Sequence, residues 1–106
     1  MNLLILADDL TGALDTGVQF AVRGISTKVV VLSASALQIP SDAEVVVIDT
    51  ETRHVRPQTA AAIVANIIRS LSKYNIKTIY KKTDSALRGN VGAELNAVMT
   101  ASHSRY

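Results

Sequence analysis

Two adjacent aspartates follow directly on a short apolar run near the start of the chain. Residues 8–15 read Asp-Asp-Leu-Thr-Gly-Ala-Leu-Asp, and the apolar run before them is Leu3–Ala7. Carboxylates this close repel one another unless cations neutralise them, water solvates them or a ligand binds them. Thr11 and Asp15 are four residues apart, so on a helix they share one face, and this face is not the apolar one. The pattern predicts a polar site where a strand passes into a helix.

Two other polar stretches also follow apolar runs. Residues 49–54 read Asp-Thr-Glu-Thr-Arg-His, and residues 82–90 read Lys-Thr-Asp-Ser-Ala-Leu-Arg-Gly-Asn. The remaining apolar run is followed by residues 33–35, Ser-Ala-Ser, which offer few groups for binding a ligand. Parallel strands bring their carboxyl ends to one edge of a sheet, and ligands bind beyond that edge. The three polar stretches therefore predict a single site.

The charged residues of these stretches carry both signs. They are Asp8, Asp9, Asp15, Asp84, Arg53, Lys82 and Arg88. Carboxylates accept hydrogen bonds from hydroxyl groups, whereas arginine and lysine donate to carboxylates or phosphates. A small molecule with several hydroxyls and an anionic end, such as a sugar acid, suits this set. The cations also explain how the paired carboxylates are tolerated.

The same residues have structural interpretations that the sequence leaves open. Asp9 or Thr11 could cap the N-terminus of a helix. Asp15 could be solvated helix surface, and Arg53 and Lys82 could form weak surface ion pairs.

The site requires strands that end in it and helices that leave it. Four short aliphatic stretches predict strands: Leu3–Ala7, Lys28–Leu32, Glu44–Ile48 and Lys77–Lys81. Helical periodicity predicts three helices, over Leu10–Ala21, over Ala60–Leu71 after Pro57, and over Val91–Val98. The apolar positions of the first are Leu10, Leu14, Val18 and Ala21. Residues 33–39 are interpreted as a short helix or an irregular segment. The alternation predicts one α/β domain over residues 1–106, with an open parallel sheet of about four strands and helices on both faces, a Rossmann-like three-layer arrangement.

Composition excludes several classes of function. Of the 106 residues 48% are hydrophobic and 19% charged, and the net charge of +2 is too small for a nucleic-acid footprint. The lack of cysteine excludes disulfides and thiolate metal sites, and the two histidines predict no transition-metal site. No apolar run could span a membrane and no basic segment precedes the first one, so a cytoplasmic protein is expected.

The glycines do not form a nucleotide-binding loop. Neither Gly-x-Gly-x-x-Gly nor Gly-x-x-x-x-Gly-Lys-[Ser/Thr] occurs. If the protein uses ATP, its ATP site is expected elsewhere, although carboxylates and a substrate phosphate could together hold Mg²⁺.

Three motifs, in this order, resemble the N-terminal domain of the four-carbon acid sugar kinase family. They are Ala7–Ala13 with Asp15 and Gly17, then Asp49–Arg53, then Lys82–Asn90 with Gly92 and Glu94. The resemblance covers residues 2 to about 99, but only the first part of a family member. It implies an ATP- and Mg²⁺-dependent kinase that phosphorylates the terminal hydroxyl of threonate, erythronate or 3-oxo-tetronate. In that family the N-terminal domain binds the sugar acid and a C-terminal domain binds ATP.

The resemblance also implies which residues form the substrate site. They are Asp8, Asp9, Thr11, Asp15, Arg53, Lys82, Asp84, Ser85 and Arg88. Among them, Arg53, Lys82 or Arg88 would hold the carboxylate of the substrate, and the aspartates would bind its hydroxyls. Either Asp9 or Asp84 would accept the proton of the attacking hydroxyl, as in other phosphoryl transfers.

The end of the chain departs from the family pattern. After Met99 the sequence indicates no further strand, and four parallel strands leave an unprotected edge. An incomplete domain is therefore expected, a fragment without the C-terminal nucleotide-binding domain, inactive as a kinase by itself and able to form a homo-oligomer through its open edge.

Two alternatives remain at this point. A receiver-type domain also has an acidic pair such as Asp8 and Asp9, a phosphoacceptor such as Asp49 and a lysine such as Lys82. A receiver-type domain has five strands, however, and residues 83–90 would have no function in it. The second alternative is a truncated, non-catalytic module that binds a sugar acid.

Overall fold

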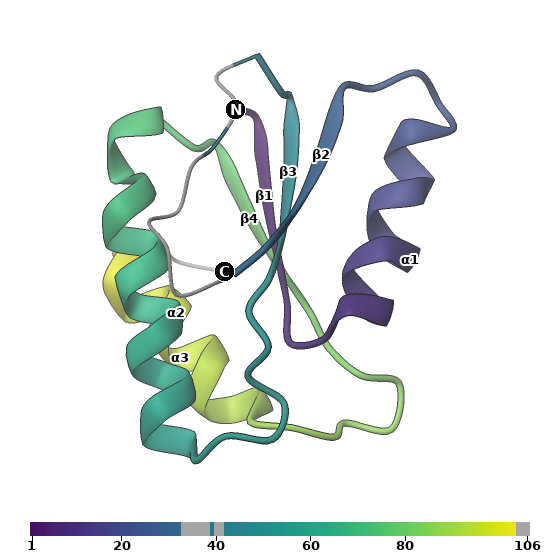
Figure 1. The fold of residues 1–106 in the computed structure, drawn as a ribbon. Coiled ribbons are helices and arrows are strands. Elements are labelled where there is room, and N and C mark those ends of the chain that lie inside the picture. Colours follow the sequence, from purple (N-terminus) through teal and green to yellow (C-terminus); the bar gives the residue numbers. More distant parts are fainter. Residues whose placement is uncertain (33–38, 40–41, 104–106) are drawn as a thin grey trace.

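Strands and helices alternate along the described chain, except that the third strand follows the second without a described helix between them (Figure 1). The computed structural model describes residues 1–32, 39 and 42–103. Its elements are β1 (Leu3–Ala7), α1 (Leu10–Ala21), β2 (Thr27–Val31), β3 (Val45–Asp49), α2 (Pro57–Leu71), the 3-10 helix η1 (Ser72–Tyr74), β4 (Thr78–Lys82) and α3 (Val91–Ser102). The interpretation of residues 33–39 as a short helix or an irregular segment falls, except for Ile39, outside the described residues.

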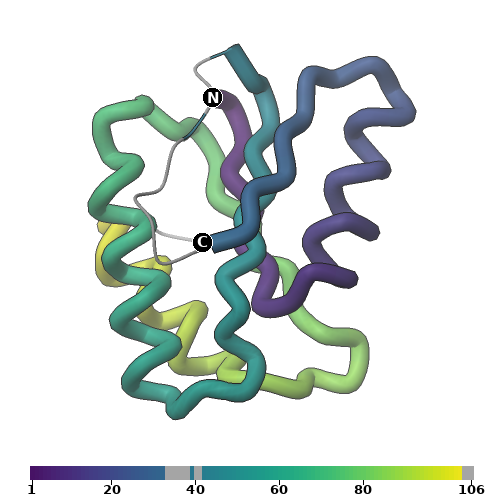
Figure 2. The backbone as a smooth tube through the Cα atoms, in the orientation of Figure 1, coloured from purple at the N-terminus to yellow at the C-terminus, as the bar shows by residue number. Residues whose placement is uncertain are grey.

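The four strands form one parallel sheet in the order β2-β3-β1-β4. Helix α1 lies on one side of the sheet, and α2 and α3 lie on the other (Figure 1 and Figure 2). The predicted three-layer α/β fold is thereby confirmed. Strand β1 is central, so the residues that follow it emerge between the ends of β3 and β4.

Three strands differ from their predicted bounds by one residue. Strand β2 begins and ends one residue earlier, whereas β3 and β4 begin and end one residue later. Strands β3 and β4 extend to Asp49 and Lys82 because both residues pair with Ala7, the last residue of β1. Asp49 and Lys82 are therefore strand residues rather than loop residues, and their side chains share the face of Ala7.

Each face of the sheet has its own apolar core. On the side of α2 and α3, the buried cluster includes Leu4, Leu6, Val46, Ile48, Val64, Ile67, Ile68, Leu71 and Val98. On the side of α1 the cluster is smaller, with Ile5, Ala7, Ala13, Val45 and Val47. None of the helices in the described part of the chain has the length and apolar character needed to cross a membrane.

Helix α1 is confirmed, but its apolar stripe does not face the sheet. Leu10, Leu14 and Val18 are 42%, 51% and 47% exposed, whereas Ala13 and Gly17 are buried. A Cβ atom on Gly17 would lie 3.0 Å from Cγ2 of Val29, so the helix packs too close to the sheet for a larger side chain. The apolar periodicity predicted the helix correctly, but the small residues Ala13 and Gly17, and not the apolar stripe, form its buried face and set the helix–sheet distance.

Candidate functional site

The loops that follow β1, β3 and β4 meet at the carboxyl edge of the sheet, the lower end in Figure 1. A pocket of about 360 Å³ lies there. It is lined by Asp9, Thr11, Gly12, Asp15, Arg53, Lys82, Asp84, Ser85 and Arg88. Every predicted site residue except Asp8 is in this lining, and Asp8 is buried and forms an ion pair with Arg53. The structure thus brings the predicted residues together, while their binding of a substrate stays a prediction.

Arg53 neutralises the paired carboxylates of the first loop. Its Nη2 atom is 2.9 Å from Oδ1 of Asp8, and its Nη1 atom is 3.0 Å from Oδ2 of Asp9. Nη2 also lies 3.5 Å from Oδ1 of Asp84. The Arg53 side chain is only 11% exposed, and the hydrogen bond that it donates to Asp8 raises its pKa above the ordinary value. The guanidinium therefore joins three loops through one buried charge cluster.

Asp9 has two roles in this arrangement. Its Oδ1 atom accepts a hydrogen bond from the backbone N–H of Gly12 at 2.9 Å, which caps α1. Its Oδ2 atom pairs with Arg53. The capping interpretation of Asp9 is thus confirmed, and the same side chain lines the pocket.

Asp84 organises the loop between β4 and α3. Its carboxylate accepts two hydrogen bonds from the Arg88 guanidinium, at 2.7 and 3.0 Å, and two from the backbone N–H groups of Ala86 and Arg88. These contacts, led by the Arg88 side chain, hold the pKa of Asp84 well below its usual range. Asp84 therefore stays ionised at neutral pH and is a poor acceptor for a proton.

Glycine is required where this loop passes over the cluster. Gly89 has a φ of 89°, in the left-handed region. A Cβ atom there would overlap Oδ2 of Asp8 and would lie 3.5 Å from Cγ of Arg53. The side chain of Asn90 then donates to the backbone oxygens of Thr52 and Val55 at 3.1 and 2.8 Å. The second and third polar loops are thereby fastened to each other.

Behind the pocket, on the opposite face of the sheet, lies a charged pair that sequence reasoning missed. Glu94 is 1% exposed, and its Oε1 atom is 3.5 Å from Nζ of Lys81. Neither Oε atom has a hydrogen-bond partner, and burial raises the pKa of Glu94 while Lys81 opposes the shift. Strand alternation was the available signal, because it places Lys81 on the face opposite Lys82.

Asp49 does not enter the pocket. It is fully buried on the α1 face, its Oδ1 atom accepts the backbone N–H of Glu51 at 3.0 Å, and its Oδ2 atom has no hydrogen-bond partner. Burial raises its pKa to about 7. A phosphoacceptor must be reached by its phosphodonor, so this carboxylate gives no support to a receiver-type domain. Within the described residues, no three His, Cys, Asp or Glu side chains are grouped so that they could hold a metal ion.

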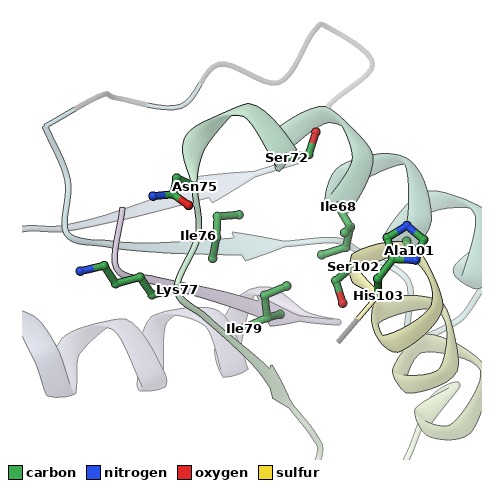
Figure 3. Close-up of a pocket in the computed structure, with 9 residues that line it drawn as sticks. All are labelled: Ile68, Ser72, Asn75, Ile76, Lys77, Ile79, Ala101, Ser102 and His103. Atoms are coloured by element: carbon green, nitrogen blue, oxygen red, sulfur yellow. The ribbon is translucent and has the colours of Figure 1, made fainter. Parts of the chain in front are cut away.

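A second pocket lies at the other end of β4 and differs in character. It has a volume of about 270 Å³, and Figure 3 shows its lining residues. They come from the ends of α2 and α3 and from the segment that leads into β4, and they include Ile68, Ile76, Ile79, Lys77 and His103. No ion pair joins its lining residues, so the carboxyl-edge pocket is the better candidate for a polar ligand.

An open parallel sheet with a charged pocket at its carboxyl edge is typical of α/β domains that bind small polar ligands. Residues 3–106 match the family model described as the sugar-binding N-terminal domain, and the chain belongs to this family. The resemblance to the N-terminal domain of the four-carbon acid sugar kinases is thus confirmed.

Curated relatives agree with this assignment. The chain is 43% identical to the D-threonate kinase of Salmonella typhimurium over 107 residues, which are 99% of this chain and 25% of the relative. It is 38% identical to the D-erythronate kinase of Heliobacterium modesticaldum over 105 residues, with 92% of this chain and 23% of the relative covered. The chain therefore spans about a quarter of the length of these relatives.

A solved structure has the same fold. It is a domain of unknown function from Bordetella bronchiseptica, described as a domain-swapped dimer with bound citrate. The TM-score is 0.82 at 36% sequence identity, with 95% of this chain and 26% of that chain covered.

Proposed function

We propose that the carboxyl-edge pocket binds a four-carbon sugar acid, threonate or erythronate, as the substrate-binding part of an ATP-dependent kinase that phosphorylates the terminal hydroxyl. The observation that carries the proposal is the convergence of carboxylates, cations and hydroxyls from three loops in one pocket of about 360 Å³. That volume suits a small molecule. The names of the relatives, D-threonate kinase and D-erythronate kinase, support the choice of a four-carbon acid.

The chemistry of the lining matches such a ligand at both ends. Carboxylates accept hydrogen bonds from the hydroxyls of a sugar acid, and a cation binds its carboxylate. The solved relative carries citrate, which is also a hydroxy acid.

The phosphoryl donor requires residues beyond those described. Asp8, Asp9 and Asp84 are paired with Arg53 and Arg88, and the described residues contain no group of three or more His, Cys, Asp or Glu side chains that could hold a metal ion by themselves. We propose that ATP and Mg²⁺ bind in the part of the kinase that corresponds to the remaining three quarters of the relatives. Of the two predicted proton acceptors we keep Asp9, because Arg88 holds the pKa of Asp84 low and makes that carboxylate a poor base.

The first test is an NMR titration of the purified chain with D-threonate and D-erythronate. Binding should shift the amide signals of residues 8–15 and 82–90 in a saturable manner and leave those around the second pocket, residues 72–79, unchanged. A well-dispersed spectrum that neither acid changes would contradict the proposal.

A second test separates binding from catalysis. The chain alone should bind the acid without phosphorylating it, and activity should appear when the remainder of the kinase is supplied as a separate polypeptide. Binding without restored activity would favour the non-catalytic sugar-acid-binding module.

A further inference from the structure

We infer that the pocket has a fixed polarity, in which Lys82 takes the carboxylate of the sugar acid and Asp15 takes a hydroxyl, while Arg53 and Arg88 act as internal clamps. The inference rests on the proposed function and goes beyond it by assigning the two ends of the ligand. Its basis is that some polar groups of the pocket already have partners within the protein, whereas others have none.

The cations of the pocket differ in their partners. Arg53 pairs with Asp8, Asp9 and Asp84. Arg88 is held by Asp84 in a two-pronged contact, at 2.7 and 3.0 Å. Within the described residues, Lys82 has no carboxylate within 4.0 Å, and its Nζ atom donates only to the backbone oxygen of Thr83, at 2.5 Å. An ammonium group has three donors, so Lys82 retains two for a ligand.

The carboxylates divide in the same way. Asp9 caps α1 and pairs with Arg53, and Asp84 binds Arg88 and two backbone N–H groups. Asp15 makes no hydrogen bond and no ion pair with any described residue, although it lines the pocket. The hydroxyls of Thr11 and Ser85 have no protein partner there either. Among the lining side chains, one cation, one carboxylate and two hydroxyls thus have no side-chain partner in the described residues, whereas both arginines are held in ion pairs even though Nε of Arg53 has no hydrogen-bond partner.

The fold places the free cation where an anion is favoured. Lys82 is the last residue of β4 and faces the side of α1, where its Cγ atom would lie 3.8 Å from a Cβ atom on Gly12. It therefore runs past the first turn of α1, whose N-terminus carries a partial positive charge. Asp15 lies one turn further along the helix from Thr11, which moves the hydroxyl-binding carboxylate away from that charge.

This polarity predicts how the pocket discriminates between ligands. Threonate and threitol have the same carbon chain, but threitol has a neutral hydroxymethyl group in place of the carboxylate. A charge-assisted hydrogen bond to Lys82 should make the acid bind roughly 10- to 100-fold more tightly than the polyol. The ratio of the two dissociation constants therefore reports on the cation that holds the carboxylate.

The experiment measures both dissociation constants by NMR titration of the whole chain and of four variants. Lys82→Met should remove the preference for threonate and leave the affinity for threitol unchanged. Asp15→Asn should weaken both ligands together. Lys28→Met and Asp42→Asn, which change exposed residues outside the pocket, are the matched controls and should behave as the wild type.

A fifth variant separates the clamps from the ligand-binding cation. Arg88→Met should weaken threonate and threitol by similar factors, because it loosens the loop around Asp84, and should keep the ratio. The inference is wrong if Lys82→Met retains the wild-type ratio of the two dissociation constants, or if Arg88→Met loses this ratio. It is also wrong if the wild type binds threonate and threitol equally while the pocket signals still shift. A chain whose pocket signals respond to neither ligand would instead contradict the proposed function itself.

Discussion

Two charge clusters lie back to back at the carboxyl edge of the sheet, and the protein satisfies them to different degrees. On the pocket side Arg53 contacts Asp8, Asp9 and Asp84. On the other face Lys81 lies 3.5 Å from Glu94, whose oxygens accept no hydrogen bond. A planar guanidinium can serve several carboxylates at once, whereas an ammonium is a point charge. The contrast suggests that the first cluster stabilises the fold, and that the second adds little to it.

Asp49 extends the comparison to a buried carboxylate with no cation at all. Its surroundings are apolar residues of the α1 face and the carboxylates of Glu51 and Asp9, all of which favour its protonated form. Three of the four buried acids, Asp8, Glu94 and Asp49, therefore form a series within the described residues from fully paired to unpaired, and the fourth, Asp84, is paired with Arg88.

The largest effect is expected when Arg53 is removed. Arg53→Met should lower the free energy of unfolding by about 3–5 kcal/mol, because it leaves Asp8 buried without a counter-charge. Urea denaturation measures the change, with Arg56→Met, an exposed arginine outside the cluster, as the control that should stay within about 0.5 kcal/mol. Similar losses for the two variants would show that the Arg53 cluster is no more important than a surface charge.

An intermediate effect, dependent on pH, is expected from Asp49. Its pKa rises from 3.8 to about 7 on folding, so the unfolded chain loses this proton first as the pH increases. Stability from this group is therefore fully present below pH 4, falls between pH 4 and 7, and is lost above pH 7. Asp49→Asn should equal the wild type near pH 4 and exceed its stability by about 2–4 kcal/mol at pH 8.

Denaturation curves at several pH values test this expectation. A stability gain that is the same at pH 4 and pH 8 would show that the Asp49 carboxylate does not titrate between these values. Asp42→Asn, an exposed aspartate, is the control for the loss of one negative charge.

The sequence was sufficient for the fold and for the composition of the pocket, but not for the second cluster. Apolar runs followed by polar residues locate strand ends, and parallel pairing then brings those ends together without further information. The contact between Lys81 and Glu94 depends on how α3 packs on the sheet, which no local pattern encodes. A one-residue shift in register likewise decides that Asp49 is buried rather than part of a loop.

Helix α1 shows a second limit of sequence patterns. Periodicity predicted the helix, but could not show that Leu14 lies outside the core and that Gly17 faces the sheet. A regular apolar stripe identifies one face of a helix without identifying what that face contacts.

The smallest effect is expected from replacing both members of the second cluster. Lys81→Met combined with Glu94→Leu should change the free energy of unfolding by no more than about 1 kcal/mol, since the apolar pair avoids the cost of burying two charges. Each single replacement leaves the other charge buried and unpaired and should be clearly destabilising. A double-mutant cycle by urea denaturation measures the coupling. If the double variant lost as much stability as Arg53→Met, the two clusters would contribute equally, and the poor geometry of the Lys81–Glu94 pair would not reflect its energy.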